Sequence, residues 1–307
     1  MTFVDPQAQA FLDRLSAAPP PSGDLAEQRE GFSALWRSMA PQPPAEIAMA
    51  SRTVEYEGHS IECLTYRPEG VEHALPVVLF LHGGGGIMLA PEDFDATSRM
   101  LADQVGALVV VVRYRRAPEH PFPQPLDDCI AVYRWLAESA VDWGGDSARI
   151  AVVGDSAGGY LAAAVAQDAK DEAAQPPLAQ VLLYPMLDMA GAAPSRFDRG
   201  AFVTDEGLRA TIALHFGDNV LDPRASPLRA PHLGGLPSTL IITTDTDPLI
   251  DEGRAYAHRL RAAGVPVSYF CYEGQVHGFF SFGGAMDEGN RCVAHVASWL
   301  RLALTSN

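Results

Sequence analysis

Residues 151–160 read Ala-Val-Val-Gly-Asp-Ser-Ala-Gly-Gly-Tyr, so that an apolar run enters a Gly-x-Ser-x-Gly pattern and leaves it as an alanine-rich segment. This order predicts a strand that turns sharply into a helix, with the Oγ of Ser156 projecting beyond the end of the sheet. Gly154 and Gly158 leave room for the tight backbone of such a turn. Ser156 is therefore a candidate nucleophile, and the alternative for so short a pattern is a turn serine that faces solvent.

The chain as a whole has the composition of a globular protein with one large domain. It has 307 residues, of which 48% are apolar, enough to bury a substantial core. Its longest apolar runs, such as residues 77–81 and 107–112, fall far short of the roughly 20 residues that cross a bilayer. Residues 1–6 carry neither the basic cluster nor the apolar run of a secretory signal. We therefore expect a cytoplasmic protein that does not bind membranes.

Charge and cysteine content exclude several classes of function. The net charge of −16 argues against nucleic acid as a partner, because phosphate binding depends on lysine and arginine. The four cysteines, Cys63, Cys129, Cys271 and Cys292, are isolated and do not have the spacing of a zinc site. We expect buried or half-buried thiols, no metal and no cofactor.

From residue 51 onward, strand-like and helix-like segments alternate, which predicts an α/β fold with a mostly parallel sheet covered by helices on both faces. Two early segments of alternating polarity, 52–57 and 60–66, predict an antiparallel edge hairpin across Gly58-His59. The later strands are solid apolar segments, and a last helix is expected over about 290–304. The predicted later strands are 77–81, 108–112, 150–153, 180–184, 239–243 and 267–271.

Two segments do not follow this alternation. Residues 1–50 hold two amphipathic helical stretches, 7–16 and 25–39, separated by the prolines at 19–21. Residues 186–236 interrupt the strand series with helix-like and proline-rich pieces. A helical insertion on the active-site side of a sheet forms a lid over a pocket. The predicted domains are a helical cap of residues 1–50 and 186–236, and a core of residues 51–185 and 237–307.

A serine hydroxyl is a weak nucleophile at neutral pH and needs a base, an acid that orients the base, and donors for the developing oxyanion. Candidate donors lie in His82-Gly83-Gly84-Gly85-Gly86, directly after an apolar strand, where an HGGG-type motif places backbone amides. We predict an oxyanion hole formed by the amides of Gly83, Gly84 and Ala157. The alternatives are a flexible loop and a phosphate cradle, although the Gly-Lys-Ser/Thr of a phosphate-binding loop does not follow.

The base and the acid are expected downstream, because a triad on such a sheet runs in the order Ser, acid, His. His277 is the candidate base, since it lies in a glycine-flanked loop between the last predicted strand and the last helix. Asp247 is the favoured acid, because Pro248 ends the preceding strand and the turn can carry the carboxylate toward His277. Asp245 and Asp251 remain alternatives, and Asp251 also fits a helix cap.

With these residues in place, the chain resembles the bacterial hormone-sensitive-lipase-like carboxylesterases, which have the α/β-hydrolase fold. The resemblance covers the chain from about residue 46 onward, and it implies Ser156 as nucleophile, Asp247 as acid and His277 as base. It also implies oxyanion donors at Gly83, Gly84 and Ala157 and a cap that includes N-terminal helices. The blocks that carry it are residues 82–85, 114–123, 154–159, 247–253 and 277–279, in the family's order.

Several residues depart from the pattern of this family, among them Arg116, where many relatives have leucine. Gly86 stands where relatives often have a large residue, Leu89 where they often have a further glycine, and Tyr160 where many have asparagine. Because the first two positions adjoin the expected acyl pocket, we treat all three as candidate substrate-binding residues.

The sequence thus predicts hydrolysis of short- to medium-chain carboxylic esters through an acyl-enzyme, with a small-molecule ester as the substrate. One alternative is an amidase, a deacetylase or a lipase that uses the same triad. A more distant one is a ligand-binding protein on an inactive hydrolase fold, which would have lost the histidine. The resemblance also suggests a homodimer through the edge strand near Val267.

Overall fold

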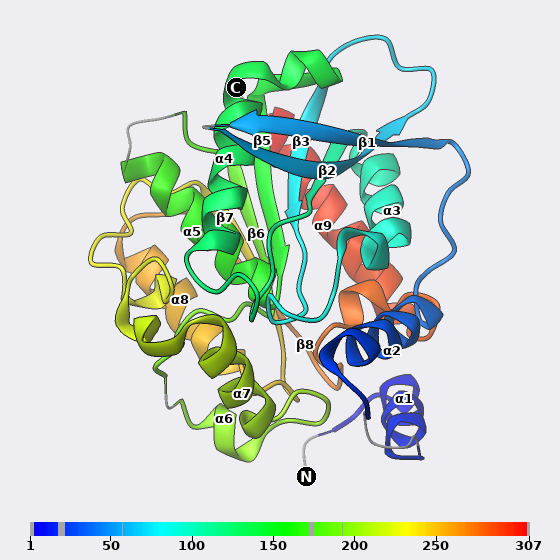
Figure 1. Cartoon of the computed structure of the whole chain (residues 1–307), viewed down its shortest axis with the longest axis vertical. Helices are drawn as coiled ribbons and strands as arrows, with labels where there is room; N and C mark the ends of the chain where they lie inside the picture. Colours follow the sequence, from blue (N-terminus) through cyan, green and yellow to red (C-terminus); the bar gives the residue numbers. More distant parts are fainter. Residues whose placement is uncertain (1–2, 18–21, 57, 172–174, 192, 306–307) are drawn as a thin grey trace.

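The computed structural model describes residues 3–17, 22–56, 58–171, 175–191 and 193–305. Within these residues an eight-stranded sheet runs through the molecule (Figure 1), in the order β1-β2-β4-β3-β5-β6-β7-β8. The pairs β1·β2 and β2·β4 are antiparallel, and the other neighbouring strands are parallel. The predicted α/β class with a mostly parallel sheet is confirmed. The strands are β1 (Ile47–Tyr56), β2 (His59–Pro68), β3 (Leu75–Leu81), β4 (Leu108–Val112), β5 (Gly145–Asp155), β6 (Ala179–Leu183), β7 (Ser238–Thr244) and β8 (Val267–Tyr272).

The strand boundaries differ from the sequence expectation at two instructive places. β1 begins at Ile47, ahead of the boundary expected at residue 51, because its ladder with β2 continues to the pair Ile47↔Pro68. β6 ends at Leu183, although Tyr184 was expected to continue it. Tyr184 has a φ of 36°, which is incompatible with an extended strand.

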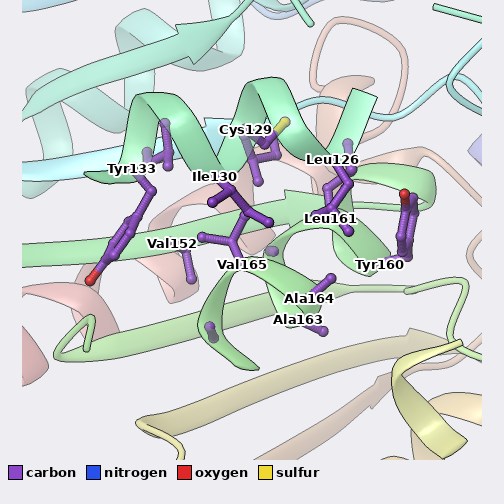
Figure 2. Close-up of a cluster of buried hydrophobic side chains, with 14 of the residues drawn as sticks. Leu126, Cys129, Ile130, Tyr133, Val152, Tyr160, Leu161, Ala163, Ala164 and Val165 are labelled. Atoms are coloured by element: carbon purple, nitrogen blue, oxygen red, sulfur yellow. The ribbon is translucent and has the colours of Figure 1, made fainter. Parts of the chain in front are cut away.

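Helices cover both faces of the sheet (Figure 1). The side chains of β3 alternate between the two faces, so that Val77 and Leu79 join one apolar cluster and Val78 and Phe80 join the other. Figure 2 shows the first cluster, where α4 and α5 pack against each other and against Val152 of β5. The α-helices are α1 (Pro6–Ala17), α2 (Leu25–Ser38), α3 (Asp95–Val105), α4 (Gln124–Ser139), α5 (Ala157–Asp171), α6 (Ser195–Asp198), α7 (Asp205–His215), α8 (Ile250–Ala262) and α9 (Asp287–Thr305), and the 3-10 helices are η1 (Pro91–Phe94), η2 (Ala140–Trp143), η3 (Gly217–Leu221), η4 (Pro227–Arg229) and η5 (Phe279–Ser281).

The helices α1, α2, α6 and α7 gather at one end of the molecule (Figure 1). Aromatic rings join the two segments from which they come: Phe11 meets Phe202 at 5.2 Å between ring centroids, and Phe32 stacks on Phe202 at 6.5 Å. Trp36 meets Phe282 of the core at 4.6 Å. Because β1 begins at Ile47, the predicted cap loses residues 47–50 to the sheet. We call residues 1–46 and 186–236 the cap segments; their division from the core stays a prediction. The prolines expected to separate the first two helices, at 19–21, and Glu57 of the expected hairpin lie outside the described residues.

A buried ion pair fastens the second cap segment to the core. Arg196 of α6 donates from Nε to Glu252 Oε1 of α8 at 2.8 Å, and both side chains are at most 3% exposed. Glu252 Oε2 also accepts from the backbone amides of Leu187 and Asp188, at 2.7 and 2.9 Å. Burial raises the pKa of Glu252, but these donors satisfy its oxygens, as a buried charge requires.

The four cysteines are free, and three of them are buried while Cys271 is half-buried, as expected. None of the described helices is long and apolar enough to cross a membrane.

Candidate active site

Ser156 occupies the turn between β5 and α5 with a φ of 56°. Its amide donates to Leu183 O at 2.9 Å, and its carbonyl accepts from Met186 N at 3.1 Å. A Cβ on Gly158 would lie 1.8 Å from Leu81 O. The backbone of this turn therefore approaches its neighbours too closely for a side chain at that position, which explains the glycine in the pattern.

A chain of hydrogen bonds joins Ser156 to two side chains from later strands. Ser156 Oγ lies 2.7 Å from His277 Nε2, and His277 Nδ1 lies 2.6 Å from Asp247 Oδ2. Asp247 follows β7 and His277 follows β8, whose parallel register with β7 brings both loops to the same edge of the sheet. Asp247 is 1% and His277 7% exposed, so water competes little for these bonds.

The two alternative acids bind elsewhere. Asp245 Oδ1 accepts from the amide of Gly274 at 2.7 Å, and Asp251 Oδ2 accepts from the amide of Ser195 at 3.1 Å. Of the three carboxylates considered from the sequence, Asp247 is the one that the structure brings into contact with His277. Among the described residues, no group of three or more His, Cys, Asp or Glu side chains is arranged to hold a metal ion.

The glycine-rich loop after β3 lies beside Ser156, but its first amide is already engaged. Gly83 N donates to Asp155 Oδ1 at 2.7 Å, so the expectation that Gly83 contributes to an oxyanion hole is corrected: a proton held by a buried carboxylate is not offered to a substrate. In the described part of the chain, no hydrogen bond uses the amides of Gly84, Gly85 or Ala157. Gly84 and Gly85 also line the cavity at Ser156.

A cavity of about 290 Å³ opens above Ser156 and His277. Both cap segments form its wall, the first through α2 and the second through α7 and the residues before it. The sequence pointed to these segments without identifying individual residues, because amphipathic helices with an apolar face carry no signal that separates core packing from pocket lining. The lining residues are Phe32, Trp36, Gly84, Gly85, Met88, Ser156, Met186, Phe202, Val203, Thr204, Gly207, Leu208, Thr211 and His277.

Residues 78–281 match the model of a family described as having the alpha/beta hydrolase fold. The chain belongs to this family. This α/β-hydrolase is 36% identical over 289 residues to carboxylesterase NlhH of Mycobacterium tuberculosis, a match that covers 91% of the chain and 89% of the relative. It is 34% identical over 292 residues to an ethyl acetate hydrolase of Pseudomonas putida, and this match also covers 91% of the chain and 89% of the relative.

Among solved structures, the α/β-hydrolase is similar to an ester hydrolase from the metagenome of Lake Arreo, in complex with a bipyridine phosphonate derivative. The TM-score is 0.93 at 34% identity, and the match covers 99% of the chain and 100% of the relative. A hyperthermophilic esterase from the archaeon Pyrobaculum calidifontis matches with a TM-score of 0.91 at 35% identity, over 98% of each chain. The resemblance to the hormone-sensitive-lipase-like carboxylesterases is confirmed.

The three candidate substrate-binding residues of the α/β-hydrolase, Gly86, Leu89 and Tyr160, are not among the residues that line the cavity. A Cβ on Gly84 would lie 2.8 Å from Leu89 Cβ, and one on Gly86 would lie 2.3 Å from His215 Cε1. Tyr160 is fully buried and meets the ring of His215 edge-on at 5.9 Å. Leu89 therefore packs against the loop at Gly84, and Gly86 leaves space for His215 of α7, whose ring Tyr160 contacts from the other side.

Asp155 is a buried carboxyl group of the α/β-hydrolase whose role the sequence did not reveal. Its Oδ1 accepts from Gly83 N, while Oδ2 has no hydrogen-bond partner among the described residues. Burial raises the pKa of Asp155 to about 7, against the opposing influence of the Gly83 amide and nearby His277. The side chain thus ties the turn at Ser156 to the glycine-rich loop.

The raised pKa of Asp155 predicts that its contribution to stability depends on pH. In the unfolded chain an aspartate has a pKa of about 3.9, so between about pH 4 and 7 the folded protein binds a proton that the unfolded chain does not. Wild-type stability should therefore fall, relative to Asp155→Asn, as the pH rises from 5 to 8. We expect a relative change of about 2 to 3 kcal/mol in the free energy of unfolding, measured by urea denaturation of both proteins at both pH values. An unchanged difference would show that Asp155 does not take up this proton.

Proposed function

We propose that this protein is a serine carboxylesterase that hydrolyses short- to medium-chain carboxylic esters through an acyl-enzyme intermediate. One observation carries the proposal: Ser156 and His277 line the 290 Å³ cavity, and Asp247 binds His277 from behind in an unbroken series of hydrogen bonds. A serine, a base and an orienting acid in this arrangement are the requirements of nucleophilic acyl transfer.

In the proposed reaction, Ser156 Oγ attacks the ester carbonyl while His277 Nε2 accepts the serine proton. Asp247 holds the imidazole in the tautomer that leaves Nε2 free to accept, and it stabilises the imidazolium that forms. His277 then donates the proton to the departing alkoxide, which leaves as the alcohol. A water molecule attacks the acyl-enzyme with His277 again as the base, and the carboxylic acid and free Ser156 are released.

The negative charge on the carbonyl oxygen is proposed to be bound by the amides of Gly84, Gly85 and Ala157. Support for this assignment comes from the position of Gly84 and Gly85 in the cavity wall, and from that of Ala157 next to Ser156. In the described residues no other hydrogen bond uses these three amides. Ala157 begins α5, so the oxyanion would also lie at the positive end of a helix dipole. Mutagenesis on other enzymes values one such donor at about 3 to 4 kcal/mol.

The cavity supports the proposed substrate class. Its volume is at the small end of the range for ligand pockets, and its wall includes Phe32, Trp36, Met88 and Leu208. An apolar pocket of this size favours short and medium acyl chains over long ones. The names of the relatives, a carboxylesterase and an ethyl acetate hydrolase, agree with such substrates.

The test is turnover of p-nitrophenyl esters from acetate to laurate, with p-nitroacetanilide as the matched amide. We expect rapid release of nitrophenol from the shorter esters, a decline toward laurate, and much slower cleavage of the anilide. A fluorophosphonate probe should inactivate the protein and label one residue, Ser156, as located by mass spectrometry of the peptides. An enzyme that turns over none of the esters, or that carries the label elsewhere, would contradict the proposal.

A homodimer through the edge strand and a cytoplasmic location stay predictions. β8 is the last strand of the sheet, and Phe270 on it is 46% exposed, which is compatible with pairing between two copies.

A further inference from the structure

The cap helix α7 is bound to the glycine-rich loop through its last residue, His215. His215 Nδ1 lies 2.9 Å from Gly85 O. A carbonyl oxygen can only accept a hydrogen bond, so Nδ1 carries the proton and donates it. The ring is fully buried, and this burial lowers the pKa of His215 to about 4. At neutral pH the imidazole is therefore uncharged, with its single proton on the nitrogen that faces the loop.

The loop depends on such bonds because its own backbone is not stiff. Gly84, Gly85 and Gly86 have φ values of 100°, 69° and 69°, and glycine reaches many other conformations at similar energy. The C=O and N–H groups of one trans peptide point in opposite directions, so whatever binds a carbonyl also orients the following amide. Gly84 O accepts from Met88 N at 2.9 Å, which orients the amide of Gly85. His215 binds Gly85 O and so fixes the next peptide plane, the one between Gly85 and Gly86.

The imidazole of His215 has itself little freedom to move. It stacks on Phe216 at 4.1 Å between ring centroids and meets Tyr160 edge-on at 5.9 Å; Figure 2 shows Tyr160 near the start of α5. The backbone carbonyl of His215 also accepts from Phe122 N at 2.8 Å. Gly86 provides the space for the ring, since a Cβ there would lie 2.3 Å from it. The donor that holds Gly85 is thus fixed from several directions.

We propose that His215 is a positioning residue for the oxyanion hole, through which the cap takes part in stabilising the transition state as well as in shaping the pocket. The same helix lines the cavity with Leu208 and Thr211, so one rigid element both contacts the substrate and holds the loop. This inference rests on the oxyanion role proposed above for Gly84 and Gly85.

Three substitutions separate the hydrogen bond from the packing. His215→Asn keeps a donor on the atom that replaces Nδ1, because both are attached to Cγ. His215→Leu has the same branching at Cγ as asparagine but no donor. His215→Gln moves its amide one carbon further, toward the place of Nε2, and provides a polar second variant should the leucine protein fail to fold. Ile212→Val, a buried change on α7 away from the cavity lining, is the control for loosening of the helix.

Steady-state kinetics on p-nitrophenyl acetate test the proposal. We expect the leucine and glutamine variants to lose about tenfold in kcat with KM within about twofold, less than the 10² to 10³ that loss of a whole oxyanion donor costs. The asparagine variant and Ile212→Val should stay within about twofold of wild type in kcat. Wild-type kcat in both the leucine and the glutamine variant, an equal loss in the asparagine variant, or an equal loss in Ile212→Val would overturn the proposal.

An inhibitor that forms an oxyanion gives a second readout. A trifluoromethyl ketone that adds to Ser156 should have its Ki raised in the leucine variant by the same factor by which kcat/KM falls, whereas a change that acts only on folding would leave Ki unaltered. Failure of the proposed function itself has a different signature, because wild-type protein would then neither turn over the ester nor bind the ketone.

Discussion

Replacement of Ser156 by alanine is expected to lower kcat/KM for p-nitrophenyl acetate by at least about 10⁴-fold. The substitution removes the one oxygen that lies 2.7 Å from His277 Nε2, so no acyl-enzyme can form. The activity that remains would come from binding and oxyanion stabilisation alone. Alanine adds no atoms at the tight turn, and we expect the melting temperature to change little. The measurement is initial-rate kinetics, with thermal unfolding of the same preparations.

Ser98→Ala is the matched control for this experiment. Ser98 on α3 is fully buried, and its hydroxyl has no hydrogen-bond partner among the described residues. The substitution therefore removes a buried serine oxygen that does not line the cavity. Its kcat/KM should equal that of wild type. Turnover that persists in Ser156→Ala at the wild-type rate would remove the nucleophile assignment.

Asp247→Asn is expected to lower kcat by about 10⁴-fold while leaving the fold intact. Asp247 Oδ1 accepts from Leu249 N at 2.8 Å, and Oδ2 faces His277 Nδ1. In asparagine the oxygen must stay on Leu249, since the amide of that residue needs an acceptor, and the NH₂ group then faces Nδ1. Two donors cannot share this contact, so the imidazole carries its proton on Nε2 and can no longer accept from Ser156.

The neighbouring carboxylate supplies the comparison. Asp245→Asn keeps an oxygen that can accept from Gly274 N and does not alter the contact with His277, so we expect kcat within a few-fold of wild type. A silent Asp247→Asn together with an inactive Asp245→Asn would show that the wrong acid had been chosen.

Those features that depend on one local stretch of chain could be predicted from the sequence. Ser156 lies in a pattern whose glycines are required by close backbone contacts at the turn. The central strands can be recognised as continuous apolar runs because both of their faces are buried. His277 and Asp247 could be located because parallel strands bring the loops at their carboxyl ends to one edge. Even the choice between Asp247 and Asp245 followed from a single residue, Pro248.

Features that depend on distant pairs could not be predicted. Gly83 looked like an oxyanion donor until the carboxylate of Asp155, far along the chain, was found to hold its amide. Gly86 and Tyr160 were expected to touch substrate, but both contact His215. No local pattern marks that histidine. The end of β6 was missed for a similar reason, since the positive φ of Tyr184 is imposed by its surroundings and not by a glycine.

The aromatic contacts between the cap segments have a consequence for the order in which the molecule becomes active during synthesis. Chains fold as they emerge from the ribosome, amino-terminal part first. Phe11, Phe32 and Trp36 are synthesised early. Their ring partners are synthesised much later, Phe202 for the two phenylalanines and Phe282 for Trp36. His277 is also made late. Both the base and the partner of Trp36 are therefore made only near the end of the chain, so a nascent chain that already contains Ser156 lacks both.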